Sequence, residues 1–167
     1  LTELHAKGYL EASIDRIEVS QESIRAYLHL GDEYQWLSLT EGDTTDPWVS
    51  ASLRNLEGTV IEPTRVSKMM EELLLKCDNN GYPFASVRLE HLEKSRKGIS
   101  GKLMLDRGRL VRIDSVVLNG PAVVAPVFLY NYLGIAPGDL YNESLLKKSD
   151  IRLDRKSTRL NSSHIPL

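Results

Sequence analysis

The sequence has a single cysteine, Cys77, among its 167 residues, so it contains neither an internal disulfide nor a CxxC metal or redox site. It also lacks an excess of positive charge, because 21 lysines and arginines stand against 23 aspartates and glutamates. We therefore expect no electrostatic capture of nucleic acid or of an anionic membrane. The longest nearly apolar stretch, residues 122–130, contains Pro126 and is far shorter than the roughly 20 residues that span a bilayer.

Catalytic and ligand-binding motifs are missing too. The sequence contains no GxSxG, no Walker loop and no GxGxxG. His5, His29 and His91 are widely separated, and none has a metal-ligand spacing such as HExxH. His91 is interpreted as a partly exposed strand residue, and Cys77 falls on the apolar stripe of a predicted helix. We expect no catalytic residue, no cofactor, no metal site and no enzyme activity.

The two ends of the chain indicate a fragment. There is no initiator methionine and no signal peptide, which is typical of a mature fragment or a piece of a larger protein. Residues 154–167 change character abruptly, and the string DRKSTRLNSSH resembles a sequencing adapter translated in frame. We expect residues 154–167 to be a non-native, disordered tail, with a native disordered tail as the alternative.

The remaining sequence repeats itself. Residues 8–14 (GYLEASI) return as residues 81–87 (GYPFASV) at an offset of 73, and Gly31 returns as Gly108 at an offset of 77. The extra four residues fit in the polar turn at residues 93–98. The repeat predicts a complete module at residues 31–107, between the C-terminal part of one module at 1–30 and the N-terminal part of another at 108–153.

Each module is predicted to read strand, helix, helix, strand, strand. Residues 34–39 have the aromatic and aliphatic content of a strand. Asp46 and Pro47 then predict the start of a short helix that ends at Gly58, with an apolar stripe at Val49, Leu53 and Leu56. A second helix is predicted from Pro63. Its apolar stripe follows helical spacing at Val66, Met69, Met70, Leu73, Leu74 and Cys77.

A hairpin closes the complete module. Ala85, Val87 and Leu89 alternate with polar residues, and the return strand alternates through residues 99–105. In the next module the pattern predicts a first strand at 110–118, a helix at 126–133 and a second helix beginning at residues 143–151. Two helices on one face of a three-stranded mixed sheet make an α+β fold.

This order of elements, with GY before the second strand and a glycine leading into the next module, resembles a POTRA domain. Residues 133–145 (LGIAPGDLYNESL) resemble the pattern between the helices of that family. The tandem arrangement is similar to the arm of BamA-like outer-membrane assembly proteins, and residues 74–87 resemble versions from Bacteroidetes-type bacteria. The resemblance implies a periplasmic scaffold of a Gram-negative outer-membrane protein. It would receive unfolded outer-membrane clients, dock accessory lipoproteins, and reach the membrane only through a C-terminal barrel that this sequence lacks.

The resemblance also implies that the second strand of each module lies at a sheet edge. Here those edges are residues 12–19 and 85–92, and an edge can accept an extended peptide as an added strand. Charges such as Arg88, Glu90 and Lys94 also suit an edge that is only protected against aggregation. The candidate peptide-binding residues are Ala85, Ser86, Val87, Arg88, Leu89, Glu90 and His91.

Gly31 and Gly108 separate consecutive modules by almost no linker, which predicts coupled but hinged neighbours. Two alternatives to an assembly scaffold stay open. One is the arm of a TamA-like or two-partner-secretion transporter. The other is a POTRA-like appendage of an enzyme whose catalytic domain lies outside this sequence.

Overall fold

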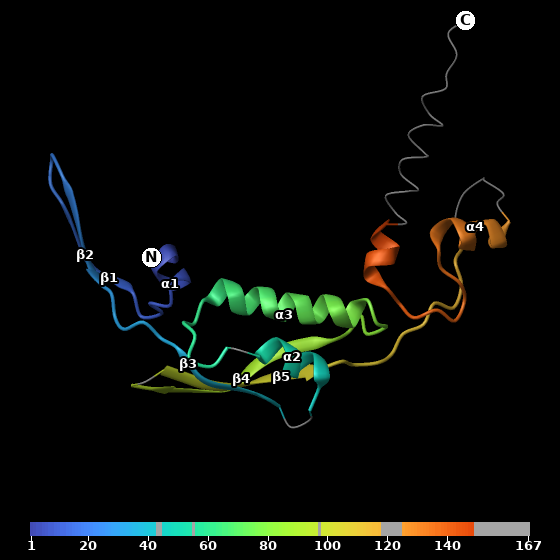
Figure 1. Ribbon diagram of the computed structural model, residues 1–167. Helices are drawn as coiled ribbons and strands as arrows, with labels where there is room; N and C mark the ends of the chain where they lie inside the picture. The colour runs from blue at the N-terminus through green and yellow to red at the C-terminus, as the bar shows by residue number, and fades with distance from the viewer. Residues whose placement is uncertain (43–44, 55, 97, 118–124, 149–167) are drawn as a thin grey trace, which may run out of the picture. The chain divides into compact units, whose positions relative to one another are not determined.

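Figure 1 shows the computed structural model of the chain, which describes residues 1–42, 45–54, 56–96, 98–117 and 125–148. The named elements are α1 (Thr2–Ala6), β1 (Ser13–Val19), β2 (Ile24–His29), β3 (Trp36–Glu41), α2 (Pro47–Leu53), α3 (Pro63–Asp78), β4 (Ser86–Ser95), β5 (Gly98–Asp106) and α4 (Pro126–Leu133). Residues 1–73 with 87–105 form one compact unit, and residues 74–86 with those from 106 onward form a second. None of the described helices is long and apolar enough to cross a bilayer.

A three-stranded sheet of order β3-β5-β4 is the centre of the predicted complete module. β3 pairs in parallel with β5, whereas β4 and β5 are consecutive along the chain and form a hairpin. Helices α2 and α3 connect β3 to β4 (Figure 1). The predicted α+β class and the element order β-α-α-β-β are therefore confirmed for this module.

The core of this module joins both helices to the sheet. Val49 of α2, Leu73 of α3 and Leu103 of β5 are buried against one another. Partly buried Met69 and Met70 pack on this cluster, which confirms the apolar stripe predicted for α3. Leu103 is completely excluded from solvent, as expected for an inward-facing residue of a central strand.

Helix α2 begins as predicted and ends earlier than predicted. The side chain of Asp46 accepts a hydrogen bond of 2.8 Å from the backbone N–H of Trp48, and Pro47 occupies the first turn, where its missing N–H removes no helical bond. The helix ends at Leu53 because Arg54 adopts an extended backbone. The predicted end at Gly58 was wrong, and Leu56 is buried from the loop that follows the helix.

Strands β1 and β2 form a separate two-stranded antiparallel sheet, and every one of their residues is exposed. The pairs Ile14–Leu28, Ile17–Ala26 and Val19–Ile24 share one face, because residues directly opposite in a ladder point the same way. One face of this hairpin is thus apolar. The ladder shifts register between Ile14 and Arg16.

The second compact unit contains α4, whose bounds match the helix predicted at residues 126–133. Residues 143–148 are also helical, and the rest of the helix predicted up to residue 151 lies outside the described residues. The strand predicted at 110–118 was wrong over its described part, where residues 111–113 make a few backbone hydrogen bonds and an isolated bridge joins Arg112 to Leu140. No strand among the described residues lies beside it, so a ladder cannot form. The tail predicted at 154–167 also lies outside the described residues.

Candidate functional site: a sheet edge and two module junctions

Strand β4 lies at the edge of the three-stranded sheet, because β5 is its single neighbour among the described strands. Ser86, Val87, Arg88, Leu89 and Glu90 form its first half, and Ala85 immediately precedes it. Val87 and Leu89 are half-buried, whereas Ser86 and Arg88 are exposed. The predicted alternation is therefore present from Ser86 to Leu89, whereas Glu90, predicted on the polar face, is half-buried. The backbone on the outer side of β4 has no partner strand in the described structure.

The regular part of this edge ends at His91. His91 has φ +51°, and it is the one described residue other than glycine with a positive φ. A left-handed residue within a strand is typical of a β-bulge. On β5, a Cβ added to Gly101 would lie 2.7 Å from Cδ2 of Leu92 and 3.5 Å from the carbonyl oxygen of Glu90, so the glycine makes room for the irregular segment. The structure thus places the predicted site residue His91 at this left-handed position, beyond the regular stretch of the edge.

The opposite edge of the sheet was missed by the sequence reasoning. β3 also lies at an edge of the described sheet. The start of β3 is partly covered on its outer side by two backbone hydrogen bonds. The backbone N–H of Trp36 donates to the carbonyl oxygen of Thr59 at 2.9 Å, and the carbonyl oxygen of Trp36 accepts from the N–H of Gly58 at 2.7 Å. β4 has no such cover in the described part of the chain, and it is the better candidate for an added strand.

The first junction is the region where the residues before Gly31 meet the complete module. The backbone N–H of Tyr34 donates to the carbonyl oxygen of Gly8 at 3.1 Å, and the carbonyl oxygen of Tyr34 accepts from the N–H of Ile61 at 2.8 Å. Gly8 has φ +89°, and a Cβ there would lie 2.4 Å from Cγ1 of Val60. Both the conformation and the close approach require glycine.

The second junction repeats this pattern within the second compact unit. The N–H of Val111 donates to the carbonyl oxygen of Gly81 at 2.7 Å, and the carbonyl oxygen of Val111 accepts from the N–H of Tyr141 at 3.0 Å. Gly81 has φ +91°, and an added Cβ would lie 2.8 Å from Cδ1 of Leu110. Gly8 and Gly81 are separated by the repeat offset of 73, and Tyr34 and Val111 by the offset of 77, whereas Ile61 and Tyr141 lie 80 residues apart.

The predicted hinge residues, Gly31 and Gly108, are equivalent in the same way. They have φ +72° and φ +65°, and each approaches the second residue after the GY pair. A Cβ on Gly31 would lie 2.9 Å from Cβ of Glu11, and one on Gly108 would lie 3.1 Å from the carbonyl oxygen of Phe84. The two positions have the permissive backbone that a hinge needs, while hinge motion itself stays a prediction.

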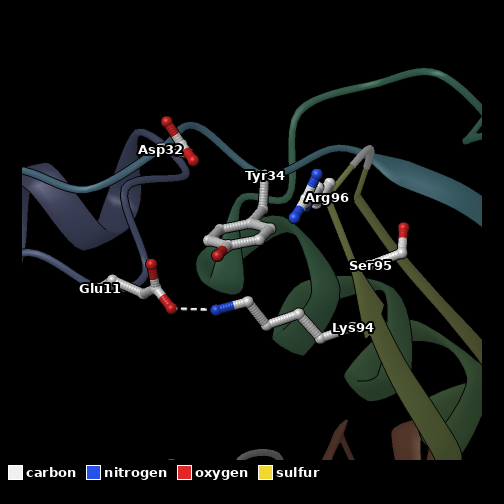
Figure 2. Close-up of a pocket in the computed structure, with 6 residues that line it drawn as sticks. All are labelled: Glu11, Asp32, Tyr34, Lys94, Ser95 and Arg96. Carbon is white, nitrogen blue, oxygen red and sulfur yellow. Dashed lines mark hydrogen bonds and ion pairs between the residues drawn. The ribbon is translucent and has the colours of Figure 1, made fainter.

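Charged side chains converge at the first junction, as Figure 2 shows. Lys94 of β4 forms an ion pair with Glu11, and its Nζ lies 5.0 Å from the centre of the Tyr34 ring. These residues, with Asp32, Ser95 and Arg96, line a hollow of about 540 Å³. The hydrogen bond with Lys94 lowers the pKa of the Glu11 carboxyl, and the same bond raises the pKa of Lys94. Both groups are therefore charged at neutral pH.

Different side chains hold the second junction. Asn79 accepts the N–H of Ser144 on its side-chain oxygen at 2.9 Å, and its carbonyl oxygen accepts Nδ2 of Asn142 at 3.1 Å. The guanidinium of Arg107 lies 5.5 Å from the centre of the Tyr82 ring. The residue equivalent to Glu11 is Phe84, which is 73% exposed.

Sequence reasoning named the hinge glycines and missed the residues that they contact. The signal for Gly8 and Gly81 was available in the repeated GY pair, whereas nothing in the sequence pairs Lys94 with Glu11, which lies 83 residues away. The described residues contain no group of three or more side chains that could hold a metal ion. The candidate site consists of a backbone edge together with two junctions.

Of three comparisons with known proteins, the one with solved structures identifies the fold. No protein-family model matches the chain, and no curated protein matches it. Among solved structures it is similar to POTRA domains 3–5 of BamA from Haemophilus influenzae, with a TM-score of 0.59, 18% identity and 93% of this chain covered. It is also similar to BamA from Haemophilus ducreyi lacking POTRA domains 1–3, with a TM-score of 0.54, 18% identity and 74% of this chain covered. The chain spans 65% and 24% of those two structures. The fold of this chain is that of the POTRA domains of BamA.

Proposed function

We propose that this chain is part of the periplasmic, non-enzymatic arm of an outer-membrane assembly or translocation protein. Its POTRA fold supports this proposal at the level of architecture. In this proposal, residues 1–30, 31–107 and 108–153 belong to three consecutive modules. Their clients are unfolded outer-membrane protein precursors, and accessory lipoproteins dock on the same arm.

The observation that carries the proposal is the uncovered edge of β4 in the described structure. An extended client segment can add to such an edge as a further strand, because backbone N–H and C=O groups supply the hydrogen bonds. Backbone recognition depends little on client sequence, which suits a scaffold that handles many different precursors. The stretch from Ser86 to Glu90 offers five residues before the left-handed residue His91.

The same edge carries features that oppose uncontrolled pairing. Arg88 and Glu90 form an ion pair of 3.3 Å beside the edge, and the left-handed backbone of His91 interrupts the regular geometry of the strand. Charges and bulges are the usual means by which proteins keep edges from aggregating. A short regular stretch with such features favours brief capture of a client over stable edge-to-edge pairing of two sheets.

A single proline substitution with a matched alanine control tests whether the edge of β4 binds a peptide. Arg88→Pro removes one backbone N–H, whereas Arg88→Ala removes the side chain and keeps that donor. The probe is a synthetic peptide with alternating apolar and polar residues, copied from a strand of an outer-membrane barrel protein. We expect Arg88→Pro to weaken peptide binding about tenfold, and Arg88→Ala to bind nearly as the unaltered chain does.

Hydrogen exchange keeps the test decisive if the proline variant unfolds. In the unaltered chain, bound peptide should slow exchange at alternate amides between Ser86 and Glu90, since alternate N–H groups of an edge strand face outward. Peptide binding that leaves these amides unprotected would contradict the proposal. Equal affinity of a folded Arg88→Pro variant would do the same.

The two alternative functions differ in the sequence that follows the modules. A TamA-like or two-partner-secretion arm would continue into segments of alternating apolar and polar residues of about 10 residues each, as would an assembly factor. An enzyme with POTRA-like appendages would continue into a soluble domain that carries a catalytic motif. Sequencing the gene past the codon for Leu153 separates the enzyme from the other two. Depletion of the protein from cells then separates the remaining two functions. Loss of many outer-membrane proteins would indicate general assembly, whereas loss of a single exported substrate would indicate a transporter arm.

A further inference from the structure

The two junctions share a backbone pattern and differ in charge. At the first, Glu11 and Tyr34 stand at the positions that Phe84 and Val111 occupy at the second. Lys94 contacts both residues of the first pair through an ion pair and a cation–π contact. Phe84 and Val111 carry no charge, so an ion pair equivalent to that of Lys94 with Glu11 cannot form at these positions.

We propose that Lys94 is an electrostatic latch that restricts the hinge at Gly31 and has no counterpart at the hinge at Gly108. Glu11 belongs to the residues before the hinge, whereas Lys94 and Tyr34 belong to the complete module after it. The left-handed backbone of Gly31 leaves the connection intrinsically permissive. Contacts between side chains on the two sides of the hinge then decide how far it moves.

The exposure of the latch makes it reversible. The side chains of Lys94 and Glu11 are 56% and 42% exposed. An exposed ion pair is weak and is screened by salt, so it biases a hinge without locking it. Lys94 also lies over the face of the Tyr34 ring, and this cation–π contact likewise depends on the positive charge of Lys94. Loss of that charge removes both contacts together.

Distance distributions between paired nitroxide labels measure the hinge directly. Exposed Glu22 and Arg65, on the two sides of the first junction, are replaced by cysteines, while buried Cys77 is left in place. Glu72→Cys with Val127→Cys forms the matched pair for the second junction. Each pair is measured at about 0.01 M and about 1 M salt, where the Debye length falls from roughly 30 to 3 Å.

We expect the distribution across the first junction to widen at high salt and the one across the second to stay unchanged. Lys94→Gln should give the wide distribution at both salt concentrations. The charge swap Glu11→Lys with Lys94→Glu should restore the narrow distribution at low salt, because it restores the ion pair. Tryptophan fluorescence of Trp36 and Trp48 establishes that each variant is folded.

Two results would overturn the latch. One is a distribution in folded Lys94→Gln as narrow as that of the unaltered chain. The other is equal widening at both junctions with salt, which would show a general effect on the hinges. Peptide binding at β4 is measured separately, so failure of the latch and failure of the proposed client site are distinguishable.

Discussion

The backbone N–H of Val111 donates a hydrogen bond of 2.7 Å to the carbonyl oxygen of Gly81. Tyr34 makes the same bond to Gly8, although the side chains of Val111 and Tyr34 have little in common. The repeated feature is thus a backbone connection between the turn after a helix and the segment that leads into the next module. Side chains around it are free to differ, and they do.

Gly8→Ala should destabilise the first compact unit more than Gly58→Ala. Both glycines have positive φ, at which an L residue costs roughly 1–2 kcal/mol. An added Cβ at Gly8 meets Val60 at 2.4 Å, whereas nothing lies within 4 Å of one at Gly58. We expect about 1 kcal/mol of additional loss for Gly8→Ala, since Val60 must shift. Urea unfolding followed by tryptophan fluorescence measures both variants, and equal losses would count against the close approach.

Cys77 should be chemically silent in the folded chain. It is fully buried in the second compact unit, and it is the single cysteine of the sequence. In the native chain, we expect a thiol reagent to react with Cys77 only as fast as the surrounding structure opens. In denaturant, the reagent should label one thiol per chain. Glu72→Cys, on the exposed face of the same helix, is the positive control and should react at once. Rapid labelling of Cys77 in the native chain would show that this end of α3 opens readily.

Tyr141 should titrate later than an ordinary tyrosine. Its hydroxyl donates a hydrogen bond to the carboxylate of Glu143, which raises the pKa of Tyr141 to about 12. The folded state therefore holds this proton more tightly than the unfolded state. The stability it contributes is present below pH 10 and is lost as pH rises from 10 through 12. Tyrosinate absorbance of the unaltered chain minus that of Tyr141→Phe isolates the group, and Glu143→Gln should return its pKa toward 10.

The hairpin of β1 and β2 should exchange its amides faster than β5. All of its residues are exposed, and an isolated two-stranded sheet is marginal in water. β5 is the central strand, and Leu103 is buried against residues of α2 and α3. Amides of β5 near Leu103 should therefore exchange only when the module unfolds globally. Hydrogen exchange read by mass spectrometry resolves both segments. Comparable protection of the two would mean that the apolar face of the hairpin is covered in solution.

Local patterns in the sequence located most of the elements. The helical spacing of Val66, Leu73 and Cys77 predicted α3, and the cap at Asp46 predicted the start of α2, because both depend on neighbouring residues. The glycines at the hinges were also visible, since the repeat aligns Gly31 with Gly108.

Features that depend on distant partners were not predictable in the same way. Residues 110–117 have the composition of a strand, but only residues 111–113 of the described part pair, through backbone hydrogen bonds to Gly81 and to residues 138–141. A longer ladder needs a neighbouring strand, which composition does not supply. The left-handed backbone of His91 occurs where β4 passes Gly101 on the return strand. The contact between Lys94 and Glu11 joins two copies of the repeat, and no single copy contains its signal.

The parallel pairing of β3 with β5 has a consequence for how such a chain grows. The polypeptide enters the complete module at the start of β3 and leaves it at the end of β5, at opposite ends of the same sheet. A gene duplication running from Gly31 to Gly108 would therefore insert one whole module with its own glycine connection at each end. The points of entry and exit would lie about one strand length apart in each added sheet, roughly 30 Å for nine residues.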